Sequence, residues 1–264
     1  HVEVLGDDQV VTSFATPPIW RFCMQEGFVL LDVVHETGNI YTRINNPTND
    51  VLEQRLAALE GGIAAVVTAS GTSAIATSLL TLLKAGDHIV ASSSLYGGTY
   101  NLLSVTLPRH GITTTFVDPS DAENFKKAAQ ENTRAFFIES LGNPKLDVLD
   151  IEAISKEAKS YKVPLIVDNT VATPYLLNPI EYGANIVIHS LTKYINGNGT
   201  ALGGVIIDAG TFDWANGKFP EFTEPSPGYH GLVYSEALEA AAFIAKIRIE
   251  GLRDYGAALS PFNA

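Results

Sequence analysis

The sequence predicts an α/β fold, with a mostly parallel sheet that carries helices on both faces. Short runs rich in β-branched residues alternate with segments whose apolar residues recur at helical spacing. Most of the strand-like runs are apolar throughout, as expected for strands that are covered on both sides. The chain has 264 residues, of which 46% are hydrophobic, so it can bury a large core.

The expected elements begin with a helix over 50–59, for which Thr48 or Asn49 is a suitable N-cap and Gly61 a left-handed C-cap. Strands are expected over 64–68, 88–92, 112–117, 135–138, 165–167, 186–188 and 205–207. Helices are expected between them over 72–84, 99–110, 122–131 and 151–161. One long helix is expected over 235–253, where the sequence is rich in alanine and then in charge.

The same pattern suggests how the chain is divided. Residues 1–45 contain prolines and turn-forming residues in place of the alternation, and we interpret them as an N-terminal arm. Residues 46–234 carry the alternation and form the large domain. Residues 235–264 are expected to form a connecting helix and the start of a truncated C-terminal domain.

Charge and composition limit the classes of partner. The net charge is −12 and no long run of Lys or Arg offsets it, which argues against nucleic acid and anionic membranes. The single cysteine, Cys23, excludes an intrachain disulfide framework and fits a reducing compartment, with a small apolar core residue as its expected role. Neither a signal peptide nor an apolar run of about 18 to 20 residues is evident, so we expect a cytoplasmic protein.

Lys193 and Asp168 each follow an apolar strand and are the first candidates for chemistry. Burial at the end of the strand would lower the pKa of Lys193 and favour the neutral amine that forms a Schiff base, although an exposed structural lysine is the alternative. An unpaired Asp168 carboxylate is costly to bury, and a pyridinium nitrogen would relieve that cost. The alternatives for Asp168 are a strand-end cap or a metal ligand, but no His, Cys or carboxylate cluster at ligand spacing accompanies it.

Three further segments could complete a site for a phosphorylated aromatic cofactor. Ser70-Gly71-Thr72-Ser73 links a strand to a helix and offers backbone N–H groups to a phosphate, as a generic glycine turn also would. Tyr96 follows a strand and precedes two glycines, so it could stack on a ring or belong to the core. His189 adjoins the lysine motif, but alternation along the strand points it away from the side of Ser190. The glycine fingerprints of dinucleotide and P-loop sites are absent from the sequence.

Taken together, these motifs resemble the Cys/Met-metabolism branch of the fold-type I pyridoxal-phosphate enzymes. The resemblance implies an aspartate-aminotransferase-like large domain. Within the branch, residues 197–200 and 225–231 look more like the acetylhomoserine sulfhydrylases than the cystathionine lyases. The segments that carry the resemblance are 38–43, 46–48, 59–62, 69–72, 95–99, 143–144, 167–170 and 189–194.

The resemblance implies a role for each candidate. Lys193 would bind pyridoxal 5'-phosphate covalently, Asp168 would pair with the pyridine nitrogen, and Tyr96 would stack on the ring. Asn143 would help hold the substrate carboxylate. Tyr41 and Arg43 would reach the phosphate of a neighbouring subunit, so that a homodimer or homotetramer shares its sites. The residues expected to hold the phosphate within the subunit are Gly71, Thr72, Ser190 and Thr192.

Two departures from the family pattern stand out. Residues 1–37 match poorly, and the smaller C-terminal domain is missing together with the arginine that clamps the substrate carboxylate. Arg248 and Arg253 are poor substitutes for that arginine because they belong to the expected connecting helix.

The implied activity is γ-replacement on O-acetyl-L-homoserine by sulfide or a thiol. The alternatives are a cystathionine or methionine γ-lyase, a cystathionine γ-synthase, and a non-catalytic assembly protein that keeps the fold. A nucleotide-binding dehydrogenase is more distant, because its glycine-rich fingerprint is missing from the sequence.

Overall fold

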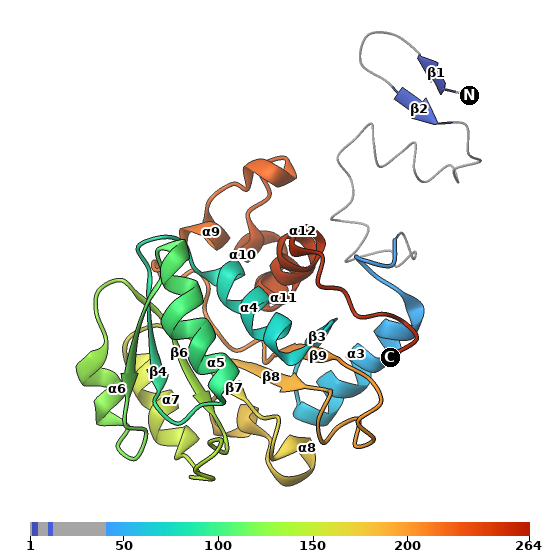
Figure 1. Ribbon diagram of the computed structural model, residues 1–264. Helices are drawn as coiled ribbons and strands as arrows, with labels where there is room; N and C mark the ends of the chain where they lie inside the picture. Colours follow the sequence, from blue (N-terminus) through green and yellow to red (C-terminus); the bar gives the residue numbers. More distant parts are fainter. Residues whose placement is uncertain (1, 5–9, 13–40) are drawn as a thin grey trace.

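The computed structural model describes residues 2–4, 10–12 and 41–264, so the predictions made for Cys23 and for 38–40 lie outside the described residues. At its centre is a seven-stranded sheet of order β3-β9-β8-β7-β6-β4-β5 (Figure 1). Strands β4 to β8 are joined to one another by parallel pairs, whereas β9 runs antiparallel to both β3 and β8. The predicted mostly parallel sheet is therefore confirmed. The strands are β3 (Ala64–Thr68), β4 (His88–Ser92), β5 (Thr113–Val117), β6 (Thr133–Glu139), β7 (Leu165–Asp168), β8 (Ile186–Ser190) and β9 (Gly204–Asp208), and a separate antiparallel pair joins β1 (Val2–Val4) to β2 (Val10–Thr12).

The helices cover both faces of this sheet. The α-helices are α3 (Pro47–Glu60), α4 (Gly71–Leu82), α5 (Gly97–Asn101), α6 (Glu123–Ala128), α7 (Ile151–Ser160), α8 (Thr173–Leu176), α9 (Pro220–Thr223), α10 (Tyr234–Ala237), α11 (Ala242–Lys246) and α12 (Arg253–Tyr255). π-Helical turns follow α5 (Leu102–Thr106) and α11 (Ile247–Leu252), and single 3-10 turns lie at Leu107–His110, Pro179–Tyr182, Pro227–Tyr229 and Glu239–Ala241.

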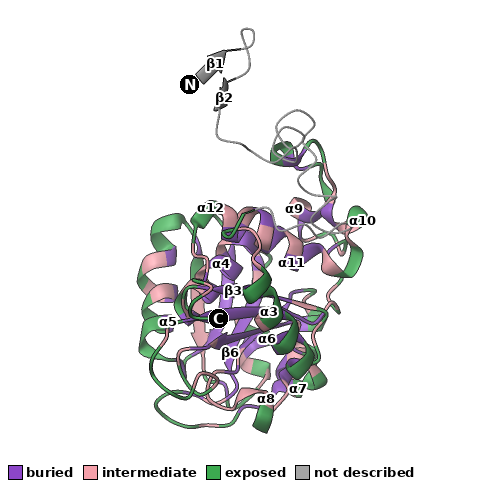
Figure 2. Ribbon diagram, turned by 90° about the vertical axis from the view of Figure 1, so that its right-hand side faces the viewer, coloured by how far each residue is buried: buried purple, intermediate pink, exposed green. Residues whose placement is uncertain are grey.

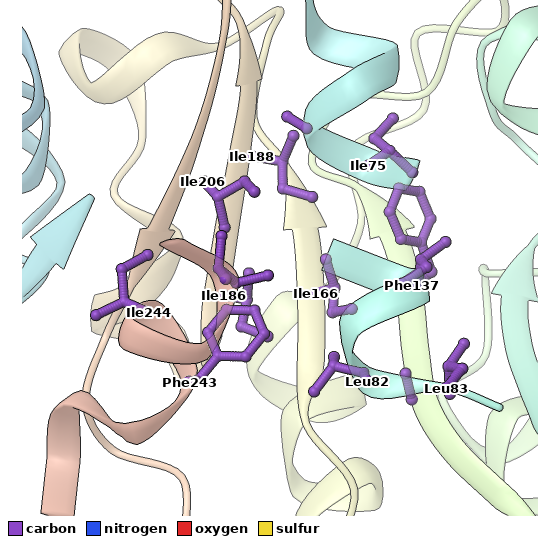
Figure 3. Close-up of a cluster of buried hydrophobic side chains, with 14 of the residues drawn as sticks. Ile75, Leu82, Leu83, Phe137, Ile166, Ile186, Ile188, Ile206, Phe243 and Ile244 are labelled. Atoms are coloured by element: carbon purple, nitrogen blue, oxygen red, sulfur yellow. The ribbon is translucent and has the colours of Figure 1, made fainter. Parts of the chain in front are cut away.

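Two apolar clusters separate the sheet from these helices. One lies beneath α4 and α11 and includes Ile188, Ile206 and Phe243 (Figure 3). The other lies beneath α3, α6 and α7 and includes Phe125 and Ile154. In Figure 2 most of the central sheet is buried, and the exposed positions lie on the outer surfaces of the helices and in the loops. Both faces are covered, which explains why most of the strands are apolar throughout rather than alternating, whereas the edge strand β5 is half-buried and rich in threonine.

The structure corrects the expected start of the first helix and confirms its end. Helix α3 begins earlier than expected, because Asn46 is its N-cap: its Oδ1 accepts a hydrogen bond from Thr48 N at 3.0 Å, and Pro47 fills the first helical position. The C-cap at Gly61 is confirmed, with φ 76°.

The prediction of one helix over 235–253 is wrong. Glu239 has φ 45°, and the chain becomes continuously helical only from Ala242, through the π-helical turn, to Tyr255. The break allows Tyr234 and Phe243, on either side of it, to enter the same buried cluster. Core packing therefore overrides the helix propensity of the alanine-rich stretch.

Candidate functional site

The predicted site residues gather at one edge of the sheet. Strand β3 runs antiparallel to β9, which runs antiparallel to β8, so β3 points the same way as β8 and its parallel neighbours. The turns that follow β3, β4, β6, β7 and β8 therefore leave the sheet at the same edge. They carry Gly71, Tyr96, Asn143, Asp168 and Lys193 respectively. In open α/β sheets ligands bind at this carboxyl edge.

The N-terminus of α4 packs against the turn after β8. A Cβ atom on Gly71 would lie 2.6 Å from the Cβ of Ser190, so only glycine permits this approach. Ser70 and Ser73 form a reciprocal capping box, in which Ser73 N donates to Ser70 Oγ at 3.1 Å. The N–H groups of Gly71 and Thr72 occupy the first two helical positions, where the helix offers no carbonyl partner. This arrangement can bind an anion.

Thr192, predicted to hold the same anion, bonds in this structure to Gly203, the residue before β9. Its hydroxyl donates to Gly203 O and accepts from Gly203 N, both at 3.2 Å. Its phosphate contact stays a prediction.

Asp168 ends β7 with one carboxylate oxygen held by its own turn. Thr170 donates to Asp168 Oδ1 from its backbone N at 3.0 Å and from its hydroxyl at 2.5 Å. Ser190 N in turn donates to the Thr170 hydroxyl at 2.8 Å, which ties the two strand ends together. Burial raises the pKa of Asp168, while the bonds from Thr170 and the charge of His189 oppose the rise. A cation bound next to this carboxylate would stabilise its ionised form.

Glu139 is a site residue that our sequence reasoning missed. It ends β6, lies opposite Asp168 in register and is only 5% exposed. Its Oε1 accepts from Tyr96 N at 2.7 Å, and the backbone N–H of Asn143 also donates to it. Burial first, and then the charge of Asp168, raise the pKa of Glu139 to about 8. The sequence does contain a feature that could have identified Glu139: like Asp168, it is an acidic residue directly after an apolar run.

Tyr96 and Asn143 both lie exposed in the turns that Glu139 joins. One of the glycines behind Tyr96 has a steric role: a Cβ on Gly98 would lie 2.5 Å from Cε1 of the Tyr96 ring. Gly97 has open space around it. The ring of Tyr96 therefore lies across its own turn at the carboxyl edge of the sheet.

Lys193 lies exposed in the turn after β8. The expectation that Lys193 is buried at the end of its strand is therefore wrong for this structure. The turn itself is fixed, since Lys193 N donates to Ser190 O at 3.2 Å and Gly197 N donates to Lys193 O at 2.8 Å.

The remaining candidates lie elsewhere. Arg43 donates to the carbonyl of Arg253 at 3.1 Å, and its guanidinium carbon lies 5.2 Å from the centre of the Tyr41 ring. Arg248 binds Glu53 at 2.5 Å and the carbonyl of Ile44 at 2.9 Å, so it serves α3 rather than a substrate. His189 is fully buried and faces away from Ser190, as alternation predicts.

A cavity of about 430 Å³ near the C-terminal end of α4 contains none of the predicted site residues. It lies between α4, α9 and the helix that ends at α12, and its lining includes Lys84, Glu221 and Lys246. Among the described helices, none has both the length and the apolar character that crossing a membrane requires.

Comparison with known proteins gives consistent matches. The chain is 60% identical to the O-acetyl-L-homoserine sulfhydrylase of Leptospira meyeri, over 97% of this chain and 61% of that protein. It is 53% identical to the homocysteine synthase of Schizosaccharomyces pombe, over 97% of this chain and 60% of that protein. The chain thus spans about three fifths of the length of these curated relatives.

A solved structure from Campylobacter jejuni, assigned as an O-acetylhomoserine (thiol)-lyase, superposes with a TM-score of 0.83 at 43% identity. The superposition covers 87% of this chain and 58% of the Campylobacter chain. That structure contains N'-pyridoxyl-lysine-5'-monophosphate. The family match runs over residues 12–264 and so begins earlier than residue 38, where the recognisable motifs start. The chain belongs to the family of Cys/Met metabolism PLP-dependent enzymes.

Proposed function

We propose that this protein catalyses a pyridoxal-phosphate-dependent γ-replacement on O-acetyl-L-homoserine. Sulfide or a thiol would replace the acetoxy group at Cγ, giving homocysteine or methionine together with acetate. The observation that carries the proposal is the convergence of Gly71, Asp168 and Lys193 at one sheet edge, in a chain 60% identical to an O-acetyl-L-homoserine sulfhydrylase.

The residues of this edge fit the cofactor. Asp168 offers a carboxylate to the pyridine nitrogen. Because burial raises the pKa of Asp168, a cationic partner would favour its ionised form. The amides of Gly71 and Thr72, together with Ser190, offer donors for the phosphate where a side chain at 71 would not fit. Tyr96 offers a ring surface, and Lys193 offers the amine for covalent attachment. When bound, the cofactor supplies the electron sink that makes the α-proton of an amino acid acidic.

The side chains would then divide the work of binding and proton transfer. Lys193 would take the α-proton of the substrate, and Tyr96 would share the later proton transfers. The turns after β8 and β4 would position these two side chains relative to the substrate. Asn143 would orient the substrate carboxylate. Glu139 would fix the turns of Tyr96 and Asn143 through their backbone amides. Acetate leaves from Cγ, and the sulfur nucleophile forms its bond at the same carbon.

The proposal includes self-association and cellular location. The contacts of Arg43 are with the carbonyl of Arg253 in α12 and with the ring of Tyr41, which supports a role of these two residues toward the site of a second subunit. We therefore propose a homodimer or homotetramer with shared sites, and we place it in the cytoplasm because the chain has a single cysteine. The domain boundaries at residues 45 and 234 remain part of the proposal.

The test is to supply the full chain and cofactor with O-acetyl-L-homoserine and sulfide. We expect homocysteine and acetate in equal amounts. Formation of 2-oxobutyrate and ammonia without homocysteine would instead identify a γ-lyase. Cofactor binding without turnover of any acyl-homoserine would identify a non-catalytic protein of the same fold.

A further inference from the structure

Arg248 lies where three segments that are far apart in the sequence meet. It belongs to the π-helical turn after α11, and its side chain is 19% exposed. Its Nη2 donates to Glu53 Oε2 in α3 at 2.5 Å and to Ala65 O in β3 at 3.2 Å. Its Nη1 donates at 2.9 Å to the carbonyl of Ile44, in the segment that precedes α3. One guanidinium therefore joins the N-terminal arm to a helix and a strand of the large domain.

The contacts with α3 and β3 satisfy backbone groups of an edge strand. β3 is the outermost strand of the sheet, and Glu53 Oε1 accepts from Val67 N at 2.9 Å. Glu53 and Arg248 thus bind the N–H of Val67 and the C=O of Ala65, which have no strand beside them on this side. The turn that carries Gly71 follows the same strand. The ion pair is therefore fixed to the strand that leads to the proposed phosphate turn.

The contact with Ile44 is separate from these, because it uses the other terminal nitrogen of the guanidinium. Tyr41 O accepts from Ile44 N at 2.8 Å, which closes a turn in the arm. Arg43 lies in this turn, directly before the carbonyl that Arg248 holds. The exposed guanidinium of Arg43 donates to Arg253 O at 3.1 Å. A neutral carbonyl is a weaker partner than a phosphate dianion, so Arg43 can exchange the one for the other.

We propose that Arg248 is a positioning residue for the cofactor site of a neighbouring subunit. By holding the Ile44 carbonyl against the Glu53 carboxylate and β3, it determines where the arm presents Tyr41 and Arg43 to the phosphate in that site. Arginine suits this role because its planar fork donates in two directions at once, which a lysine ammonium does not reproduce. The inference rests on the proposed function, in which subunits share their sites.

The test uses mixed oligomers of the full chain, in which one subunit supplies the lysine and the other supplies the arm. The lysine donor carries Arg43→Ala and the arm donor carries Lys193→Ala, so only sites between the two types have both groups. The oligomers are purified through a different tag on each subunit. The readout is the concentration of pyridoxal 5'-phosphate that gives half of the borohydride-reduced adduct on the lysine donor, measured by intact mass.

Arg248→Met in the arm donor should raise this concentration about tenfold, as expected when one charge-assisted hydrogen bond to the phosphate is lost. The same change in the lysine donor, whose own arm is already disabled, should alter the concentration by less than about twofold. This dependence on placement separates a positioning role from a general loss of stability.

The matched control is Arg134→Met in the arm donor. The side chains of the Arg134–Asp87 pair are 20% and 7% exposed, against 19% and 6% for Arg248–Glu53, but this pair lies at the other edge of the sheet. The control should leave the concentration unchanged. If Arg248→Met subunits do not fold or assemble, Glu53→Gln/Arg248→Met takes their place, because it removes both charges of the pair and keeps an acceptor for Val67 N.

Equal losses for both placements of Arg248→Met, or an equal loss for the Arg134→Met control, would overturn the inference and leave an ion pair that serves folding alone. Mixed oligomers that bind the cofactor no better than the lysine donor alone would refute the shared sites of the proposed function, and the inference with them. Mixed oligomers that regain binding but do not respond to Arg248→Met in the arm donor would refute the inference alone.

Discussion

At the edge of the sheet where β4 and β6 begin, an arginine pairs with the buried carboxylate of Asp87, whereas at the opposite edge no lysine or arginine of the described residues pairs with Asp168 or Glu139. The two ring nitrogens of His88 lie 2.8 Å from the Thr133 hydroxyl and 2.9 Å from the Thr115 hydroxyl. Asp87 lies 3.5 Å from Arg134 Nε and accepts from Lys84 N at 2.9 Å. At this edge, the polar groups of His88 and Asp87 therefore have their partners within the chain.

At the carboxyl edge, Asp168 and Glu139 lie side by side on β7 and β6, and burial raises the pKa of both. The hydrogen bonds that they accept come from a neighbouring hydroxyl and from backbone amides, and none comes from a lysine or arginine of the described residues. The difference indicates that the first edge serves the fold, whereas the carboxyl groups of the second edge are available to pair with a cationic group of a ligand.

The largest expected effect is the loss of cofactor affinity in Asp168→Asn. Losing one partner of a buried charged hydrogen bond costs about 2 to 5 kcal/mol, so cofactor affinity should fall about 30-fold to 4,000-fold. Absorbance titration with pyridoxal 5'-phosphate measures it. The matched control is Asp87→Asn at the other edge, which should lower stability but leave cofactor affinity unchanged. Equal affinities for wild type and Asp168→Asn would remove the distinction between the edges.

A smaller effect is expected for Glu139→Leu, which leaves the backbone amides of Tyr96 and Asn143 without an acceptor. An unsatisfied buried donor costs about 1 to 3 kcal/mol, so kcat/KM should fall about tenfold to a hundredfold. Glu139→Gln keeps an acceptor oxygen and should lose less. Steady-state kinetics that rank the two variants in the opposite order would argue against a positioning role.

The same residue makes stability depend on pH. Because the pKa of Glu139 rises from 4.5 to about 8 in the folded protein, the folded state binds the proton more tightly than the unfolded state. Its stabilising contribution is complete below pH 4.5 and is lost as the pH rises through about 8. Denaturant unfolding at pH 5 and pH 9 should show that wild type loses about 1 to 2 kcal/mol more than Glu139→Gln over this interval. A parallel loss in both proteins would mean that Glu139 does not titrate there.

The smallest effect is expected for Arg43→Ala, which removes a predicted phosphate ligand at the rim. Cofactor affinity should fall about tenfold, the value of one charge-assisted hydrogen bond. Mixed oligomers that combine Arg43→Ala subunits with Lys193→Ala subunits should regain one intact type of site. Oligomers that form without this gain would show that the arm serves its own subunit.

The fold and the outline of the site could be predicted from the sequence, because both rest on local patterns. Runs rich in β-branched and other strand-forming residues marked every strand of the sheet, and Gly71, Asp168 and Lys193 each follow an apolar run. Contacts between distant segments could not be predicted in this way. Glu139 becomes a site residue only because β6 pairs with β7 in one register, and Glu60 meets His189 across 129 positions of sequence. The exposure of Lys193 likewise depends on which segments pack against its turn, and the strand that precedes Lys193 does not determine this.

The most direct test is the intact mass of the full chain after incubation with pyridoxal 5'-phosphate and reduction with borohydride. We predict that wild type carries a single stable pyridoxyl phosphate and that Lys193→Ala carries none. An adduct retained by Lys193→Ala, or wild type that carries none, would contradict the assignment of this sheet edge as the cofactor site.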